Sequence, residues 1–145
     1  MSAFDNIQRK IQTWAQARQT TSEWQANGEK IVFTNGCFDL LHYGHIHYLA
    51  DAKDLGSKLI VGINSSDSVS RLKGPTRPIN DDLTRLHNMA ALEMVDLVAV
   101  FEEDTPLDLI RLLHPDVLVK GGDWPVESIA GAADVLSWGD RKSVV

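Results

Sequence analysis

Residues 30–45 read KIVFTNGCFDLLHYGH, and they decide the fold class of this 145-residue chain. The first five, KIVFT, form a short apolar, β-rich run that is typical of a buried strand. Asn35-Gly36 breaks the run. From Gly44 the apolar residues recur at helical spacing, and Gly56 is expected to close that helix. A strand, a glycine turn and a helix in this order predict the first β-α unit of a parallel sheet.

The same alternation continues along the chain. Further buried strands are predicted at 58–63, 96–101 and 116–120, with the opening of a fifth at 141–145. Helices are predicted at 80–93, at 105–113 (with Thr105 as N-cap) and at 128–138. Residues 64–79 predict a long loop, which inside a compact domain is usually functional. We therefore expect an α/β fold, a Rossmann-like doubly wound parallel sheet of 4–5 strands with helices on both faces.

The N-terminal residues have a pattern of their own. Phe4, Ile7, Ile11 and Trp14 predict one amphipathic helix over roughly 3–18. We expect a helical segment at 1–27, followed by a single globular domain at 28–145. The helix would pack on the flank of that domain or on a second subunit. With Trp14 it favours a homodimer, a hypothesis that a monomeric mass in light scattering would overturn.

Composition narrows the classes of partner. The chain is 43% hydrophobic, carries a formal net charge of −6 and has Cys37 as its one cysteine, so no internal disulfide can form. A net negative charge argues against nucleic acid. No run reaches the ~20 apolar residues of a membrane helix, and we expect a cytoplasmic protein without a membrane partner. Local basic residues still suit a small anion: Arg71, Lys73, Arg77, Arg85 and Lys120.

The strongest chemical signal lies between the first strand and its helix. A helix start offers free N–H groups and a favourable dipole to a phosphate. Gly36 and Gly44 let the backbone approach a ligand closely. His42 and His45 are three residues apart at the helix start, so they project to the same side. Each can donate a hydrogen bond to phosphate oxygens, on which charge builds as phosphorus is attacked.

Less specific interpretations of these residues exist. Two histidines beside Cys37 could bind zinc, but no second Cys or His cluster completes a four-ligand shell, so no protein-bound metal is expected. Cys37 is expected to be a small packed side chain. Asp39 could brace the turn or serve only as an Asx-turn carboxylate. Lys73 and Arg77, taken singly, are more often solvated surface charges.

Gly36-Cys37-Phe38-Asp39 followed by His42-Tyr43-Gly44-His45 resembles the signature of the HxGH nucleotidyltransferase superfamily. Segments 71–80, 90–93 and 115–123 resemble the heptose 1-phosphate adenylyltransferases, and the resemblance covers about 28–138. It implies transfer of the adenylyl group of ATP to D-glycero-D-manno-heptose 1-phosphate, giving ADP-heptose for lipopolysaccharide and pyrophosphate. Direct in-line attack by the acceptor phosphate is implied, with Mg²⁺ on the leaving pyrophosphate.

The resemblance also implies roles for individual residues. His42, His45 and the cation Lys73 would be catalytic. Acceptor contacts would come from Asn64, Asp67, Arg77 and Arg85, although Arg85 could instead pair with Asp81 or Asp82. The nucleotide-binding residues would be Thr34, Asn35, Gly36, Cys37, Phe38, Gly44, Lys120, Gly121, Gly122 and Asp123.

Two departures from the family keep rival functions open. The family continues past the fifth strand into a helix with a Ser/Thr-rich first turn, whereas this sequence ends at Val145, and Trp124-Pro125 also differs. The chain could be a cytidylyltransferase for glycerol 3-phosphate or a similar alcohol phosphate. It could also be a nucleotide-binding domain disabled by the missing tail. A NAD-type Rossmann protein is disfavoured, since no Gly-x-Gly-x-x-Gly follows the first strand.

Overall fold

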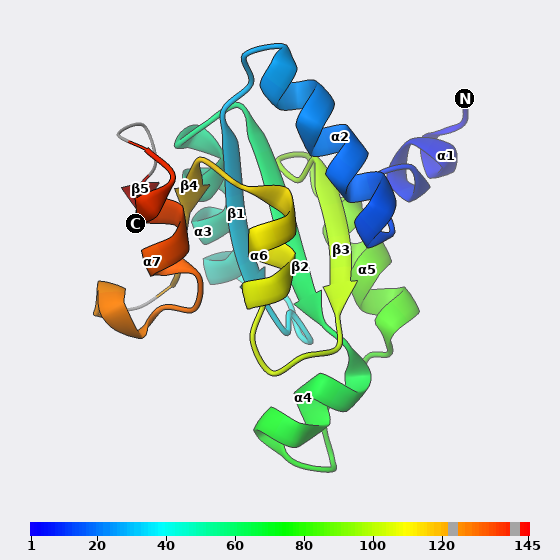
Figure 1. Cartoon of the computed structure of the whole chain (residues 1–145). Helices are drawn as coiled ribbons and strands as arrows, with labels where there is room; N and C mark the ends of the chain where they lie inside the picture. The colour runs from blue at the N-terminus through cyan, green and yellow to red at the C-terminus, as the bar shows by residue number, and fades with distance from the viewer. Residues whose placement is uncertain (122–124, 140–142) are drawn as a thin grey trace.

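The computed structural model describes residues 1–121, 125–139 and 143–145. Its centre is a five-stranded sheet in the order β3-β2-β1-β4-β5, and every pairing is parallel (Figure 1). The order reverses between β1 and β4, as in a doubly wound sheet, so the predicted fold class is confirmed. The strands are β1 (Ile31–Gly36), β2 (Lys58–Asn64), β3 (Leu97–Phe101), β4 (Val117–Leu118) and β5 (Ser143–Val144).

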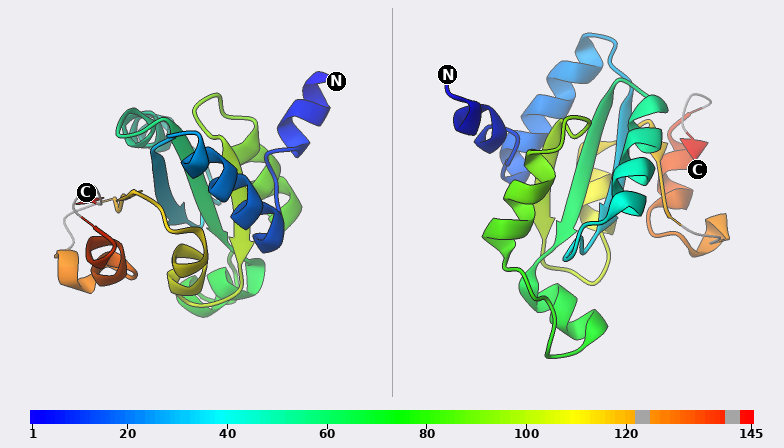
Figure 2. Two further views of the ribbon diagram at one scale, coloured as in Figure 1. Left: turned by 45° about the horizontal axis from the view of Figure 1, so that its top comes forward. Right: turned by 180° about the vertical axis from the view of Figure 1, so that it is seen from behind.

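Helices cover both faces of the sheet, as Figure 2 shows from behind and from above. Helices α2, α6 and α7 pack on one face, and α3 and α5 pack on the other. No helix in the described ranges is long and apolar enough to cross a bilayer. The helices are α1 (Ala3–Gln8), α2 (Trp14–Ala26), α3 (Tyr43–Asp54), α4 (Ser66–Lys73), α5 (Asp82–Ala90), α6 (Leu107–Leu113), the 3₁₀ turn η1 (Val126–Ser128) and α7 (Ala132–Ser137).

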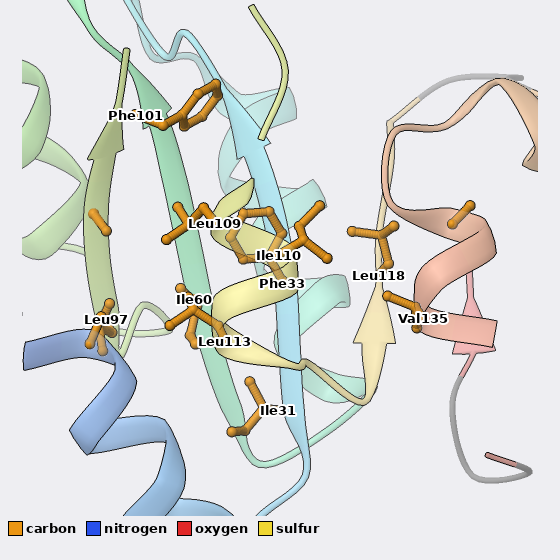
Figure 3. Close-up of a cluster of buried hydrophobic side chains, with 13 residues drawn as sticks. Ile31, Phe33, Ile60, Leu97, Phe101, Leu109, Ile110, Leu113, Leu118 and Val135 are labelled. Atoms are coloured by element: carbon orange, nitrogen blue, oxygen red, sulfur yellow. The ribbon is translucent and has the colours of Figure 1, made fainter. Parts of the chain in front are cut away.

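The core forms because successive strand residues point to opposite faces. In β1, Ile31 and Phe33 join the cluster under α2, α6 and α7, whereas Val32 joins the cluster under α3 and α5. Figure 3 shows the first cluster, with Leu109 of α6 beside Phe33. Both faces of the central strands are apolar, which explains why they read as continuous hydrophobic runs. The sheet is therefore a rigid base for the loops at its carboxyl edge.

The single N-terminal helix predicted at 3–18 is wrong. Ile11 bridges Val98 of β3, and the chain turns there before Thr13 caps α2. The Trp14 indole N–H donates to the Val100 carbonyl at 2.8 Å, and Ala17 is fully buried against the sheet. Trp14 is therefore part of this chain's own packing, which removes the argument that drew on it for a homodimer.

The loop predicted at 64–79 contains a helix, α4, which projects beyond the carboxyl edge of the sheet at the bottom of Figure 1. Asp82 holds its N-terminus, since one carboxylate oxygen accepts from both the N–H and the hydroxyl of Ser66 at 2.7 Å. These contacts join residues 16 positions apart. The polar sequence of α4 did not predict a helix, because hydrogen bonds to residues distant in the sequence hold this helix in place.

Two predictions about helix ends have different outcomes. Helix α3 does end at Gly56, just after its C-cap Leu55, but the glycine does not have the positive φ of a C-terminal glycine. It is needed because a Cβ there would lie 2.6 Å from the Lys30 carbonyl oxygen, whereas the N-cap predicted for α6 is wrong. At α6, the cap position is Pro106 and no side chain caps the helix. The Leu107 N–H does reach the Thr105 hydroxyl, but at 3.5 Å this is a weak bond.

Candidate active site

A cavity of about 590 Å³ opens at the carboxyl edge of the sheet, where β1 and β4 lie side by side. Ligands of doubly wound sheets bind at this edge, beside the reversal of strand order. The cavity brings together most of the residues predicted from the sequence. Its lining comprises Asn35, Gly36, Cys37, Phe38, Asp39, Leu40, His42, His45, Tyr48, Lys73, Arg77, Lys120 and Gly121.

The two histidines form the cap of α3. The Gly44 N–H donates to His42 Nδ1 at 3.0 Å, and the His42 N–H donates to His45 Nδ1 at 3.2 Å. Because each Nδ1 accepts, each neutral ring carries its proton on Nε2, an assignment that follows from these bonds. The ring centroids lie 4.0 Å apart. The backbone thus leaves two Nε2–H donors side by side at the cavity.

The surroundings of His45 keep it neutral. Burial lowers the pKa of His45, and the neighbouring His42 and Lys73 lower it further. Phe38 meets the His45 ring edge-on, with ring centroids 5.7 Å apart. His45 is therefore held as an uncharged hydrogen-bond donor beside a cation.

Glycine is required twice in this loop for steric reasons. A Cβ on Gly44 would lie 2.8 Å from Cε1 of His42, so only glycine lets the imidazole fold over the first turn. A Cβ on Gly36 would lie 2.8 Å from the Phe38 ring. Phe38 itself has φ of 46°, a left-handed conformation that costs energy in a non-glycine residue. The loop is shaped to place these rings and not merely to turn the chain.

Asp39 links this loop to the segment before α5. Its two carboxylate oxygens accept the N–H groups of Ile79 and Asn80, both at 2.8 Å. Arg77 Nε lies 3.2 Å from the same carboxylate and forms an ion pair with it, but it has no hydrogen-bond partner among the described residues. Burial alone would raise the pKa of Asp39, but these hydrogen bonds and the charges of Arg77 and Arg85 lower it. Of the two interpretations, a bracing role is the one this geometry supports.

Lys73 is the last residue of α4, and Gly74 ends the helix with φ of 103°. Across the turn, the Ser70 hydroxyl donates to the Arg77 carbonyl at 2.6 Å. Lys73 lines the cavity, and its ammonium group has no hydrogen bond or ion pair within the described ranges. It is thus a cation available to an anionic ligand.

For Arg85 the sequence left two roles open, contact with the acceptor or pairing with Asp81 or Asp82; the structure shows the pairing with Asp82, and the side chain is fully buried. One terminal nitrogen donates to the carbonyls of Cys37 and Asn64, at 3.0 and 2.6 Å, and Nε donates to the Asn80 carbonyl at 3.0 Å. The other terminal nitrogen pairs with Asp82 at 2.7 Å. Arg85 therefore ties three loops of the site together and presents no surface to a ligand.

Thr34 is likewise fully buried and lines neither cavity of the site. Its hydroxyl donates to the Val119 carbonyl at 2.9 Å and lies 2.5 Å from the Tyr48 hydroxyl. Burial raises the pKa of Tyr48, which stays a neutral phenol. Thr34 thus positions Tyr48, a cavity residue missed from the sequence although it stands one helical turn after His45.

A second cavity of about 390 Å³ adjoins the first. The two share a wall made of Asn35, Gly36, Cys37, Lys73 and Lys120. The remainder of the second cavity comes from the end of β2, from α4 and from the loop after β3. Those lining residues are Asn64, Leu72, Asp104, Thr105, Pro106, Ser128, Ile129 and Ala130.

The remaining predicted residues divide into three groups. Asn64 lines the second cavity, and its side-chain amide donates to Ser68 at 3.0 Å. Asp67 is exposed on α4 and lines neither cavity. Gly122 and Asp123 lie outside the described residues. Asp104 and Thr105 were missed, since only their place after β3 at the carboxyl edge could have marked them.

Within the described ranges, no group of three or more His, Cys, Asp or Glu side chains is arranged to hold a metal ion. The carboxylate of Asp39 is already used by two N–H groups and Arg77. Mg²⁺ is bound in many enzymes through substrate phosphates with few protein ligands. A Mg²⁺ carried by the phosphates of a nucleotide would need no such protein cage.

The chain is similar in sequence to known proteins. A family model described as cytidylyltransferase-like matches residues 33–137. The bifunctional protein HldE of Magnetococcus marinus is 52% identical over 136 residues, which cover 94% of this chain and 28% of that protein. HldE of Trichlorobacter lovleyi is 54% identical over 121 residues, covering 83% of this chain and 25% of that protein. The chain thus spans about a quarter of the length of these relatives.

The fold is also similar to that of solved structures. A lipopolysaccharide core biosynthesis protein from Thermoplasma volcanium superposes with a TM-score of 0.67 and 30% identity, over 81% of this chain and 95% of that one. A pantoate-beta-alanine ligase from Francisella tularensis, crystallised with an ATP analogue and beta-alanine, superposes with a TM-score of 0.63 at 16% identity. The second likeness concerns the fold alone.

Proposed function

The chain belongs to the cytidylyltransferase-like family and is a nucleotidyltransferase, and on this premise we propose that it transfers the adenylyl group of ATP to D-glycero-D-manno-heptose 1-phosphate. The observation that carries the proposal is the pair of Nε2–H donors of His42 and His45, which line the same cavity as the Lys73 ammonium, a group without an ion pair in the described part of the chain. The HldE relatives favour the heptose branch of the family.

In the proposed complex the nucleotide occupies the first cavity. His42 and His45 donate hydrogen bonds to oxygens of the α-phosphate, and Lys73 neutralises the phosphates as a point charge. The backbone of Gly36, Cys37 and Phe38 lies beneath the nucleotide. Because the donors are in place before the reaction, they stabilise the charge that develops on the α-phosphate oxygens without reorganising.

The acceptor approaches from the second cavity, with its phosphate at the shared wall. An oxygen of this phosphate attacks the α-phosphorus, the new O–P bond forms, and the bond from the α-phosphorus to the bridging oxygen breaks. The electron pair leaves with pyrophosphate. The attacking oxygen is already an anion, so no general base is needed, and His45 remains neutral throughout. A Mg²⁺ carried by the nucleotide would supply neutralisation of the negative charge on the leaving pyrophosphate.

The test is pyrophosphate release with Mg²⁺, from ATP and from CTP, with heptose 1-phosphate and glycerol 3-phosphate as acceptors in turn. We expect release from ATP with heptose 1-phosphate. Release from CTP with glycerol 3-phosphate would instead favour a cytidylyltransferase, the rival to which the family description points. Nucleotide binding without release from any pair would identify a disabled domain.

A further inference from the structure

The second cavity has a polar wall that phosphate transfer does not use. Asp104 and Thr105 line it from the loop after β3, and neither residue lines the first cavity. The Asp104 carboxylate is two-thirds exposed, with 66% of its side-chain surface accessible. Its Oδ1 accepts from Arg71 Nε at 2.9 Å, whereas Oδ2 has no hydrogen bond within the described ranges.

Helix α4 holds this loop through hydrogen bonds to three successive residues, Glu102, Glu103 and Asp104. The Ser68 hydroxyl donates to the Glu103 carbonyl at 2.8 Å. Arg71 donates to the Glu102 carbonyl through a terminal nitrogen and to Asp104 through Nε. The same helix ends at Lys73, which lines both cavities. The position of the carboxylate is therefore set relative to the cation at the shared wall.

The charges orient a ligand in this cavity. Lys73 and Lys120 stand at the shared wall and attract a phosphate, whereas the carboxylate of Asp104 repels one. An ionised carboxylate only accepts hydrogen bonds, so its natural partners are neutral donors such as hydroxyl groups. Leu72, Pro106 and Ile129 add apolar surface for the C–H face of a ring. The cavity thus suits a molecule with a phosphate at one end and hydroxyl groups at the other.

We propose that Asp104 is a specificity-determining residue that accepts hydrogen bonds from hydroxyl groups of a sugar phosphate acceptor. Thr105, the next residue, also lines this cavity, and its hydroxyl is a second polar group of the same loop. Arg71 holds the carboxylate in place and lowers its repulsion of the acceptor's phosphate. The proposal rests on the proposed function and extends it: the wall selects a polyhydroxylated acceptor over a short alcohol phosphate.

The test is steady-state pyrophosphate release from ATP by the wild type and three variants, with heptose 1-phosphate and glycerol 3-phosphate as acceptors. Asp104→Asn keeps the shape of the side chain but removes the negative charge of its carboxylate. We expect the KM for heptose 1-phosphate to rise about tenfold, since hydrogen bonds to charged groups are stronger than neutral ones. The KM for ATP and kcat should stay within about twofold. Preference for the sugar over glycerol 3-phosphate, as a ratio of kcat/KM, should fall by a similar factor.

Two matched variants separate the roles. Glu103→Gln removes a neighbouring exposed carboxylate that does not line the cavity, and its KM values should not change. Arg71→Met breaks the ion pair but leaves the carboxylate, so the rise in sugar KM should be smaller than for Asp104→Asn. If the KM for heptose 1-phosphate rose equally in Arg71→Met and Asp104→Asn, Asp104 would have a structural role only, and the proposal would be overturned.

Failure of the proposal is distinguishable from failure of the proposed function. A wild type that turns over ATP and heptose 1-phosphate, with an unchanged sugar KM in Asp104→Asn, overturns the role of Asp104 and leaves the function standing. A wild type that releases no pyrophosphate with any sugar phosphate overturns both, and this is visible before any variant is made.

Discussion

The carboxyl edge of the sheet carries the two adjoining cavities of the candidate site, whereas a larger cavity lies at the amino edge, away from His42 and His45. It measures about 890 Å³ and lies between α2, the end of α6 and Trp138. Its polar groups serve the fold: Gln25 donates to the His114 carbonyl at 2.8 Å, and Arg18 donates to the Leu112 carbonyl at 3.4 Å. At the carboxyl edge, by contrast, Nε2 of His42, Nε2 of His45 and the ammonium group of Lys73 have no hydrogen-bond partner among the residues that the structure describes. Available donors, more than volume, mark the site.

The largest expected effect is on the donors of the carboxyl edge. His45→Ala removes an Nε2–H that we place on the α-phosphate, and kcat should fall about 10²–10³-fold, as when one oxyanion-hole donor is lost. Pyrophosphate release at saturating substrates measures it. His47→Ala is the matched control, because His47 is an exposed residue of the same helix that pairs with Asp51 at 3.0 Å. Equal activity in the two variants would contradict the role of His45.

The second prediction concerns stability, and it tests whether Arg85 is needed to hold the loops of the carboxyl edge together. Arg85→Met leaves the buried carbonyl of Asn64 and the part-buried carbonyls of Cys37 and Asn80 without their donor. Unsatisfied buried groups cost about 1–3 kcal/mol each, so the free energy of unfolding should fall by about 3 kcal/mol. Urea denaturation measures it. Arg111→Met, which breaks an exposed ion pair with Asp134, should change stability little; similar losses in both variants would mean that burial of Arg85 is not what matters.

The contrast between Arg85 and the strands shows what the sequence can predict. Apolar runs and glycine breaks predicted the α/β class, because a strand buried on both faces is a continuous run of apolar residues in the sequence. The loop with His42 and His45 was equally visible, since its hydrogen bonds join near neighbours. Arg85 looks like a surface residue of a helix start. It is fully buried, and two of the carbonyls to which it donates, those of Cys37 and Asn64, are 48 and 21 positions away, so no local pattern predicts these contacts.

The same limit explains the other errors. Helix α4 was missed because its polar residues are held by Asp82 and Asp104, both distant in sequence. The N-terminal helix was drawn too long because the bridge from Ile11 to Val98 interrupts an otherwise helical spacing. In each case a tertiary contact overrides the local pattern. The topology of the sheet can therefore be predicted from the sequence, whereas the parts of the site that come from several loops cannot.

A third test uses pH to ask whether the cation of α4 acts on the histidines. The folded-state pKa of His45 lies below its ordinary value of about 6.5, through burial, His42 and Lys73. The neutral ring's contribution to stability is therefore present above about pH 6.5 and is lost as pH falls through the folded-state pKa. In Lys73→Met the pKa should rise towards its ordinary value, by NMR titration of the ring proton. An unchanged pKa would place Lys73 away from His45.

The smallest expected effect concerns the amino edge, and it is the one that could break the comparison. The double variant Arg18→Met/Gln25→Ala removes two exposed hydrogen bonds that close the larger cavity. Each such bond contributes on the order of 1 kcal/mol or less, so unfolding should become slightly easier. Because these residues lie at the opposite edge from His42 and His45, kcat/KM for both substrates should stay within about twofold. A tenfold loss of kcat/KM at unchanged stability would mean that the larger cavity takes part in the reaction, and available donors would no longer be sufficient to locate a site in this fold.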